Sequence, residues 1–317
     1  MAFSTNFKVF GITTTTLLLL TAVKASIAIP TTGTTALREE AHKKNITIGS
    51  GAINPTYLED PVFAAVLAEQ FNSLHPENEM KWSFINPTPG HYNWDPIDLN
   101  ITNPKALRAA MTTHFEAIMH RHEGRIDRWD VVTEALKTMG GGLNANDFSR
   151  QLGPGYINEA FRTARAASPG AKLYINENQV EVLPCKRQEL EDLVFRIVAD
   201  GVPIDGVALQ MHITEVAPVH GVITDMVRFY KALGLQVEIA EMDVHTLNKI
   251  LQTQIYGAVV KEALEAGITD INFWGFTDKH AHTWVPGAKP LMFDENYKPK
   301  GAFYATHSDL EEFVNEC

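Results

Sequence analysis

Two glutamates occupy positions where short apolar stretches reach their ends. Glu134 directly follows residues 128–133, and Glu241 lies within residues 236–244. Both stretches have the composition of strands, and strands that alternate with helices pair in parallel. Their carboxylates then emerge at one end of the sheet, where a β/α barrel carries its active site. Two carboxylates in one cleft suit glycoside cleavage, because one can protonate the leaving oxygen while the other attacks or activates water.

The residues around this pair suit the same chemistry. Residues two apart on a strand point the same way, so Asp243 shares a face with Glu241, and Gln210 shares one with His212. His212 can then bridge to Glu241 and hold it ionised, as a nucleophile requires. Glu134 leaves an apolar strand, and we expect desolvation to favour the protonated form that an acid catalyst uses.

Stretches of strand length alternate with stretches of helix length along most of the chain. We expect strands at residues 46–50, 71–74, 128–134, 172–176, 206–212, 236–244 and 271–276. We expect helices at residues 57–70, 104–122, 156–167, 186–199, 223–233, 247–265 and from 299 onward. This alternation is typical of an α/β TIM (β/α)8 barrel, but it supplies one strand too few.

The missing strand can be located. Residues 86–103 are rich in Pro, Asn and Asp and read as loop throughout. They follow the second predicted strand and precede the strand that ends at Glu134, where a barrel has its third strand. We therefore expect a barrel that lacks strand three and its preceding helix.

Length and charge limit the classes of protein. A chain of 317 residues with 45% hydrophobic content can bury one barrel core, since barrels commonly run to about 250 residues. The formal net charge of −11 repels phosphate backbones, so we expect no nucleic-acid partner.

The first 28 residues have the features of a secretory signal peptide. Lys8 precedes the apolar residues 9–23, and small residues lead to Ala28. The alternative is a membrane anchor, but threonines interrupt the run, which falls short of a ~20-residue span. We expect a secreted protein with a single domain at residues 29–317 and no membrane attachment in the mature form.

Two further features depend on that compartment. Asn45 and Asn100 each begin a sequon and are compatible with glycosylation. Cys185 and Cys317 could pair outside the cell, or Cys317 could be free or pair between chains.

Six motifs in the chain follow one another in a familiar order. They are Glu77-Asn78-Glu79-Met80-Lys81-Trp82, Trp129-Asp130-Val131-Val132-Thr133-Glu134-Ala135, Gln210-Met211-His212, Ile239-Ala240-Glu241-Met242-Asp243, Trp274-Gly275-Phe276-Thr277-Asp278-Lys279 and Trp284-Val285-Pro286-Gly287. From about residue 36 to 303 the chain closely resembles glycoside hydrolase family 10, the secreted endo-1,4-β-xylanases, most of all the fungal ones.

The resemblance implies roles for these residues. Glu134 would be the general acid/base and Glu241 the nucleophile of a retaining reaction on xylan or xylo-oligosaccharides. Asp243 and Thr133 would support the pair. The implied sugar-binding residues are Glu77, Asn78 and Lys81 on the non-reducing side, Gln210 and His212 on the floor, and Trp274 and Trp284 as walls and platform, since indole faces stack well on flat ligands.

We expect a monomer that needs no cofactor. His280 and His282 could suggest a metal, but no third or fourth ligand has the expected spacing, so we predict none.

The chain departs from the family in several places. Thr133 stands where the family has Asn, residues 176–179 replace Asn-Asp-Tyr-Asn, and the spacing from Asp278 to Trp284 is two residues longer than in fungal members. Together with the missing strand, these departures leave two alternatives open. Either the sequence lacks a segment of a working xylanase, or the chain is a degenerate xylan-binding relative, a decoy or lectin-like protein.

Overall fold

The computed structural model describes residues 30–77 and 103–315 of the chain. Its strands form one parallel sheet in the order β2-β1-β8-β7-β5-β4-β3, and β6 pairs with β7 off this path. The strands are β1 (Thr47–Ile53), β2 (Ser73–Pro76), β3 (Arg128–Thr133), β4 (Lys172–Glu177), β5 (Gly206–Leu209), β6 (His212–Ile213), β7 (Gln236–Val244) and β8 (Asp270–Phe273).

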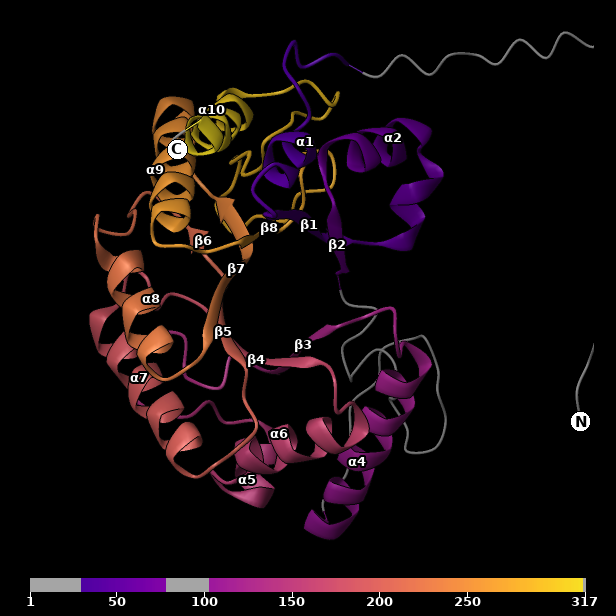
Figure 1. Cartoon of the computed structure of the whole chain (residues 1–317), viewed down its shortest axis with the longest axis vertical. Helices are drawn as coiled ribbons and strands as arrows, with labels where there is room; N and C mark the ends of the chain where they lie inside the picture. The colour runs from indigo at the N-terminus through magenta and orange to yellow at the C-terminus, as the bar shows by residue number, and fades with distance from the viewer. Residues whose placement is uncertain (1–29, 78–102, 316–317) are drawn as a thin grey trace, which may run out of the picture.

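Helices lie on the outer side of this curled sheet (Figure 1). They are α1 (Leu37–His42), α2 (Pro61–Gln70), α4 (Pro104–Arg121), α5 (Asp147–Leu152), α6 (Tyr156–Ala167), α7 (Pro184–Ala199), α8 (Val222–Ala232), α9 (Lys249–Glu265) and α10 (Gly301–Asn315), with a 3₁₀ helix, η1 (Pro55–Glu59). Within residues 30–77 and 103–315, no helix has the length and apolar character to span a membrane.

The fold is a TIM-barrel-like sheet that stays open on one side. Figure 1 shows the sheet curling until β2 and β3 face each other, and these two strands are its unpaired edges among the described residues. The opening falls where strand three was predicted to be absent. The predicted loop at residues 86–103 lies outside the described residues except for Asn103, which caps α4.

Capping side chains explain where two of the predicted helices, α4 and α2, begin. Asn103 accepts hydrogen bonds from the N–H groups of Lys105 and Ala106 and precedes Pro104, which suits a first helical turn. The predicted helix at 57–70 was wrong at its start. The side chain of Asp60 caps α2, which leaves Tyr57 in η1.

Two predicted strands also end differently. The strand at 206–212 is interrupted, because Met211 has a φ of 63° and breaks the extended backbone between β5 and β6. The strand at 271–276 stops at Phe273, since Gly275 takes a φ of 97°. The short helices α1 and α5 were not predicted; each is six residues long, too short for a clear periodic pattern.

The buried residues form two clusters, one on each side of the sheet. Leu173 and Ile175 of β4 point outward into the large cluster beneath the helices. Tyr174 points inward, where it forms a small separate cluster with Ala208 and Ala240. This alternation continues along β4, so the polar Asn176 faces the barrel interior at the carboxyl end of the strand.

Candidate active site

Glu134 is the first residue after β3, at the carboxyl end of the sheet. Its backbone has a φ of 53°, and its N–H donates to the carbonyl of Asn176 over 2.9 Å. Its carboxylate accepts a hydrogen bond from Nε2 of the buried Gln210 at 3.2 Å. Glu134 is exposed, so the described residues do not supply the desolvation that we expected.

Glu241 lies on β7, where the pairing with β8 is irregular between Ile239 and Met242. Its Oε1 accepts from Nδ2 of Asn176 at 2.9 Å. Its backbone N–H donates to the carbonyl of Gln210 at 3.1 Å. Gln210 and Asn176 therefore each contact both catalytic candidates, which brings the two predicted glutamates together at one end of the barrel.

His212 links Glu241 to Asp243, as the strand spacing predicts. Its Nδ1 lies 2.8 Å from Oδ1 of Asp243, and its Nε2 lies 3.3 Å from Oε2 of Glu241. Both ring nitrogens face carboxylate oxygens, which only accept, so the ring carries both protons.

The charges around His212 explain its protonation. Burial lowers the pKa of His212, but Asp243 and Glu241 outweigh it and raise the pKa to about 10. Burial likewise raises the pKa of Asp243, but the histidine beside it holds that pKa below its ordinary value. The pair forms a buried positive and negative charge behind Glu241, with the Nε2 side of the imidazolium ring facing Oε2 of Glu241.

Two tryptophans stand beside this chain of polar groups. The ring centroid of Trp284 is 5.6 Å from that of His212, and the ring of Trp274 is 6.1 Å away, both edge-on. Trp284 keeps 50% of its surface exposed. Trp274 also lines a hollow with Glu77, which lies just after β2.

The other predicted site residues can be placed only in part. Thr133 is the last residue of β3 and is exposed beside Glu134. Asn78 and Lys81 lie outside the described residues, so their predicted contacts with sugar stay predictions.

A family profile matches most of this chain. The profile of glycosyl hydrolase family 10 matches residues 36–103 and 97–309. The chain belongs to glycosyl hydrolase family 10. The match consists of two segments that overlap at residues 97–103, which follow β2 and precede β3 in the sequence.

Similar proteins include bacterial and fungal xylanases. "Endo-1,4-beta-xylanase B" of Thermotoga neapolitana is 30% identical over 326 residues, which is 88% of this chain and 93% of that protein. "Endo-1,4-beta-xylanase 3" of Hypocrea jecorina is 30% identical over 269 residues, 76% of each chain. The solved structure of xylanase 10B from Thermotoga petrophila RKU-1 in complex with xylobiose is 31% identical with a TM-score of 0.81, covering 89% of this chain and 99% of that one.

The first of these relatives has more residues than this chain over the matched region. The alignment spans 326 positions, whereas 88% of this chain is about 279 residues, so about 47 positions face no residue of this chain. The particular likeness to fungal members stays a prediction, since bacterial relatives match as well.

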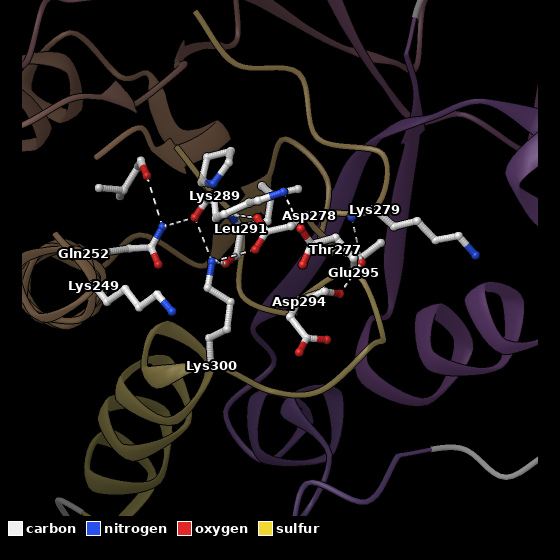
Figure 2. Close-up of polar contacts among 12 residues, drawn as sticks. Lys249, Gln252, Thr277, Asp278, Lys279, Lys289, Leu291, Asp294, Glu295 and Lys300 are labelled. Carbon is white, nitrogen blue, oxygen red and sulfur yellow. Dashed lines mark hydrogen bonds and ion pairs between the residues drawn. The ribbon is translucent and has the colours of Figure 1, made fainter. Parts of the chain in front are cut away.

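The loop after β8, which carries both tryptophans of this family 10 site, is anchored from below. Lys300 donates to Asp278 at 2.8 Å and to the carbonyls of Lys289 and Leu291 at 2.7 and 2.6 Å (Figure 2). Burial lowers the pKa of Lys300, although Asp278 opposes the shift. All three ammonium protons have acceptors, so the base of the loop is fixed.

Sequence reasoning missed two residues of the site. Asn176 contacts Glu241, and His245 lies 2.9 Å from the same Oδ1 of Asp243 that His212 contacts. The spacing of two residues along a strand would have found His245, since it continues the series of Glu241 and Asp243.

Three of these groups could be considered as metal ligands. His212, Asp243 and His245 bring donor atoms within 4.8 Å of one another. A ligating nitrogen must be free of its proton, however, and both nitrogens of His212 face carboxylates as donors. The arrangement fits a protonated His212 between two carboxylates better than a bound ion, so the prediction of no metal stays a prediction.

Proposed function

We propose that this chain is a secreted endo-1,4-β-xylanase that cleaves internal β-1,4-xylosidic bonds with retention. The observation that carries the proposal is the arrangement of Glu134 and Glu241. Both carboxylates emerge at the carboxyl end of the sheet, and Gln210 and Asn176 contact both residues. Retention calls for two carboxyl groups about 5 to 5.5 Å apart.

In the first step, an oxygen of Glu241 attacks the anomeric carbon of the bound xylose. Glu134 gives its proton to the glycosidic oxygen, so the bond between that carbon and oxygen breaks and the shortened chain leaves as an alcohol. The protonated His212 lies 3.3 Å from Oε2 of Glu241 and orients this carboxylate for attack. Gln210 orients the proton donor through its hydrogen bond to Glu134.

In the second step, Glu134 acts as a base. It removes a proton from water, whose oxygen attacks the same anomeric carbon and displaces Glu241. Two inversions restore the original configuration, and both glutamates return to their starting protonation states.

The substrate class is supported by the aromatic residues and by the relatives. Trp284 is half exposed and can stack on a sugar ring. Solved structures of relatives include xylanases in complex with xylobiose, xylotriose and xylopentaose. Secretion is supported by the signal-like residues 1–28 and by the polymeric substrate, which does not enter a cell intact.

One alternative deserves a direct comparison. Three features favour a xylan-binding relative without turnover: Glu134 is exposed, Thr133 lies beside it, and β2 and β3 have unpaired edges among residues 30–77 and 103–315. Such a protein would keep Trp274 and Trp284 but lack a fixed wall around the bond to be cleaved.

The test is an assay on xylan beside a pull-down with insoluble xylan. The parent protein should release new reducing ends, and Glu241→Ala and Glu134→Ala should each lose most of that activity while still binding. If the parent binds xylan but releases no more ends than Glu241→Ala, the chain is a binding protein. If it neither binds nor cleaves, both proposals fail.

A further inference from the structure

His245 lies at the buried end of the chain of polar groups that begins at the nucleophile candidate. It is the second residue after Asp243 and the first after β7, and its side chain is fully buried. Its backbone N–H donates to the carbonyl of Ile213 over 2.7 Å, which fixes its position beside β6.

The two ring nitrogens of His245 face different parts of the site. Nε2 lies 2.9 Å from Oδ1 of Asp243, and Nδ1 lies 2.9 Å from Oγ1 of Thr283. Asp243 thus sits between two histidines, because the same oxygen is 2.8 Å from His212. A continuous series of contacts runs from Glu241 through His212, Asp243 and His245 to Thr283.

The ring of His245 makes a third contact, with the sugar platform. It stacks on Trp284 with ring centroids 3.7 Å apart and an angle of 27° between the planes. Thr283 precedes Trp284 and also accepts a hydrogen bond from the N–H of Val285. One imidazole therefore supports the tryptophan from beneath and holds the turn that carries it.

We propose that His245 is a positioning residue that couples the sugar platform to the nucleophile, an inference that rests on the proposed function. Its nitrogen fixes the carboxylate of Asp243, which orients His212 and through it Glu241. Its ring face fixes Trp284. A core histidine that only filled space would need neither the contact with Asp243 nor the stack.

Two substitutions separate these contacts. His245→Phe keeps a flat ring beneath Trp284 but removes both nitrogens. His245→Gln keeps an amide nitrogen that can reach Asp243 but removes the ring. We expect the Phe variant to lose kcat by roughly tenfold to a hundredfold at nearly unchanged KM, since small misplacements of reacting groups cost about that much.

The Gln variant should show the opposite change. We expect its kcat on xylo-oligosaccharides to stay within a few-fold of the parent, with a raised KM and weaker quenching of tryptophan fluorescence by xylohexaose. His114→Phe replaces a buried histidine of α4 outside the site and serves as the matched control, with both parameters unchanged. A shared loss of the same parameter in both His245 variants, or no change in either, would overturn the proposal.

A measurement without substrate tests the role of His245 independently of whether the protein turns over xylan. The Nδ1 proton of His212, locked on Asp243, should give a slowly exchanging NMR signal in the parent and in His245→Gln. That signal should broaden or vanish in His245→Phe. If the signal persists in His245→Phe, His245 does not position Asp243 and His212. If the parent turns over no xylan but the signal behaves as stated, only the proposed function fails.

Discussion

Four residues with side chains take a left-handed backbone at the carboxyl ends of strands. Ala52, Glu134, Gln179 and Met211 have φ values of 49°, 53°, 61° and 63° and lie within two residues of the carboxyl ends of β1, β3, β4 and β5. Such conformations cost on the order of 1–3 kcal/mol each and persist only where the surrounding structure holds them. They gather at the end of the barrel that carries both glutamates, and Glu134 is itself one of them.

Thr133 gives the first prediction at this scale. The Asn of the family can bind the sugar 2-hydroxyl, and a preorganised hydrogen bond that tightens in the transition state is worth about 10²–10³ in rate. We expect Thr133→Asn to raise turnover on xylan, by no more than that factor. Turnover is compared with the parent and with Glu241→Ala as the inactive control; equal rates for parent and variant would contradict the argument.

The charge on His212 gives a prediction about pH. The pKa of His212 is raised to about 10 in the folded protein, above its ordinary value of about 6.5. The group binds its proton more tightly when folded, so its contribution to stability is complete below pH ~6.5 and disappears as pH rises to about 10. We expect His212→Gln to lower the free energy of unfolding by a few kcal/mol at pH 6 and by much less at pH 10.

Urea unfolding at the two pH values measures this difference. His220→Gln is the matched control, because the side chain of His220 is 88% exposed. If the difference in free energy of unfolding between the parent and His212→Gln is the same at pH 6 and pH 10, the proton on His212 does not stabilise the fold.

At the residue scale, strand spacing predicted the contacts of His212 with Glu241 and Asp243. The exposure of Glu134 could not be predicted in the same way. It depends on which segments cover the carboxyl end of the sheet, and a local pattern does not contain that information.

At the scale of elements, a buried ion pair ties β4 to α7 and to the loop after Glu134. Lys186 and Glu177 are both fully buried, 2.8 Å apart, and Lys186 also donates to Asn178 at 2.6 Å. The other carboxylate oxygen of Glu177 accepts from the N–H of Leu136 at 2.9 Å. Glu177 and Asn178, which differ from the residues of the family at these positions, therefore both contact the buried Lys186.

This pair gives the prediction at the scale of elements. Lys186→Met leaves the charge of Glu177 buried without its partner, which typically costs about 3–5 kcal/mol of stability. Replacing both residues, as Glu177→Gln with Lys186→Met, should recover much of the loss. Lys172→Met on the same strand removes an exposed lysine and should cost less than about 1 kcal/mol.

Thermal and urea unfolding compare these three variants. If Lys186→Met is no less stable than Lys172→Met, the buried pair does not hold β4 in place. The strands and long helices could be predicted from apolar patterns, but this cross-connection could not, because Glu177 and Lys186 are polar residues in a stretch that reads as surface.

At the scale of the whole molecule, the opening between β2 and β3 in the described part of the chain is the main departure from a closed β/α fold. Arg128 of β3 reaches across the interior and contacts Glu238 of β7 at 2.5 Å and Asp270 of β8 at 2.9 Å. These ion pairs tie one edge of the sheet to its centre. The sequence allowed the gap to be predicted because a barrel strand needs an apolar run, and residues 86–103 have none.

The central claim is that this open barrel still assembles a retaining pair with Glu241 as nucleophile. A xylobioside with 2-fluoro substitution and a dinitrophenolate leaving group should react once and then stall, because fluorine slows hydrolysis of the intermediate more than the good leaving group slows its formation. Peptide mapping by mass spectrometry after this reaction should find one xylobiosyl adduct, on the peptide that contains Glu241, and none in Glu241→Ala. An unlabelled parent, or a label that survives Glu241→Ala, would contradict the account.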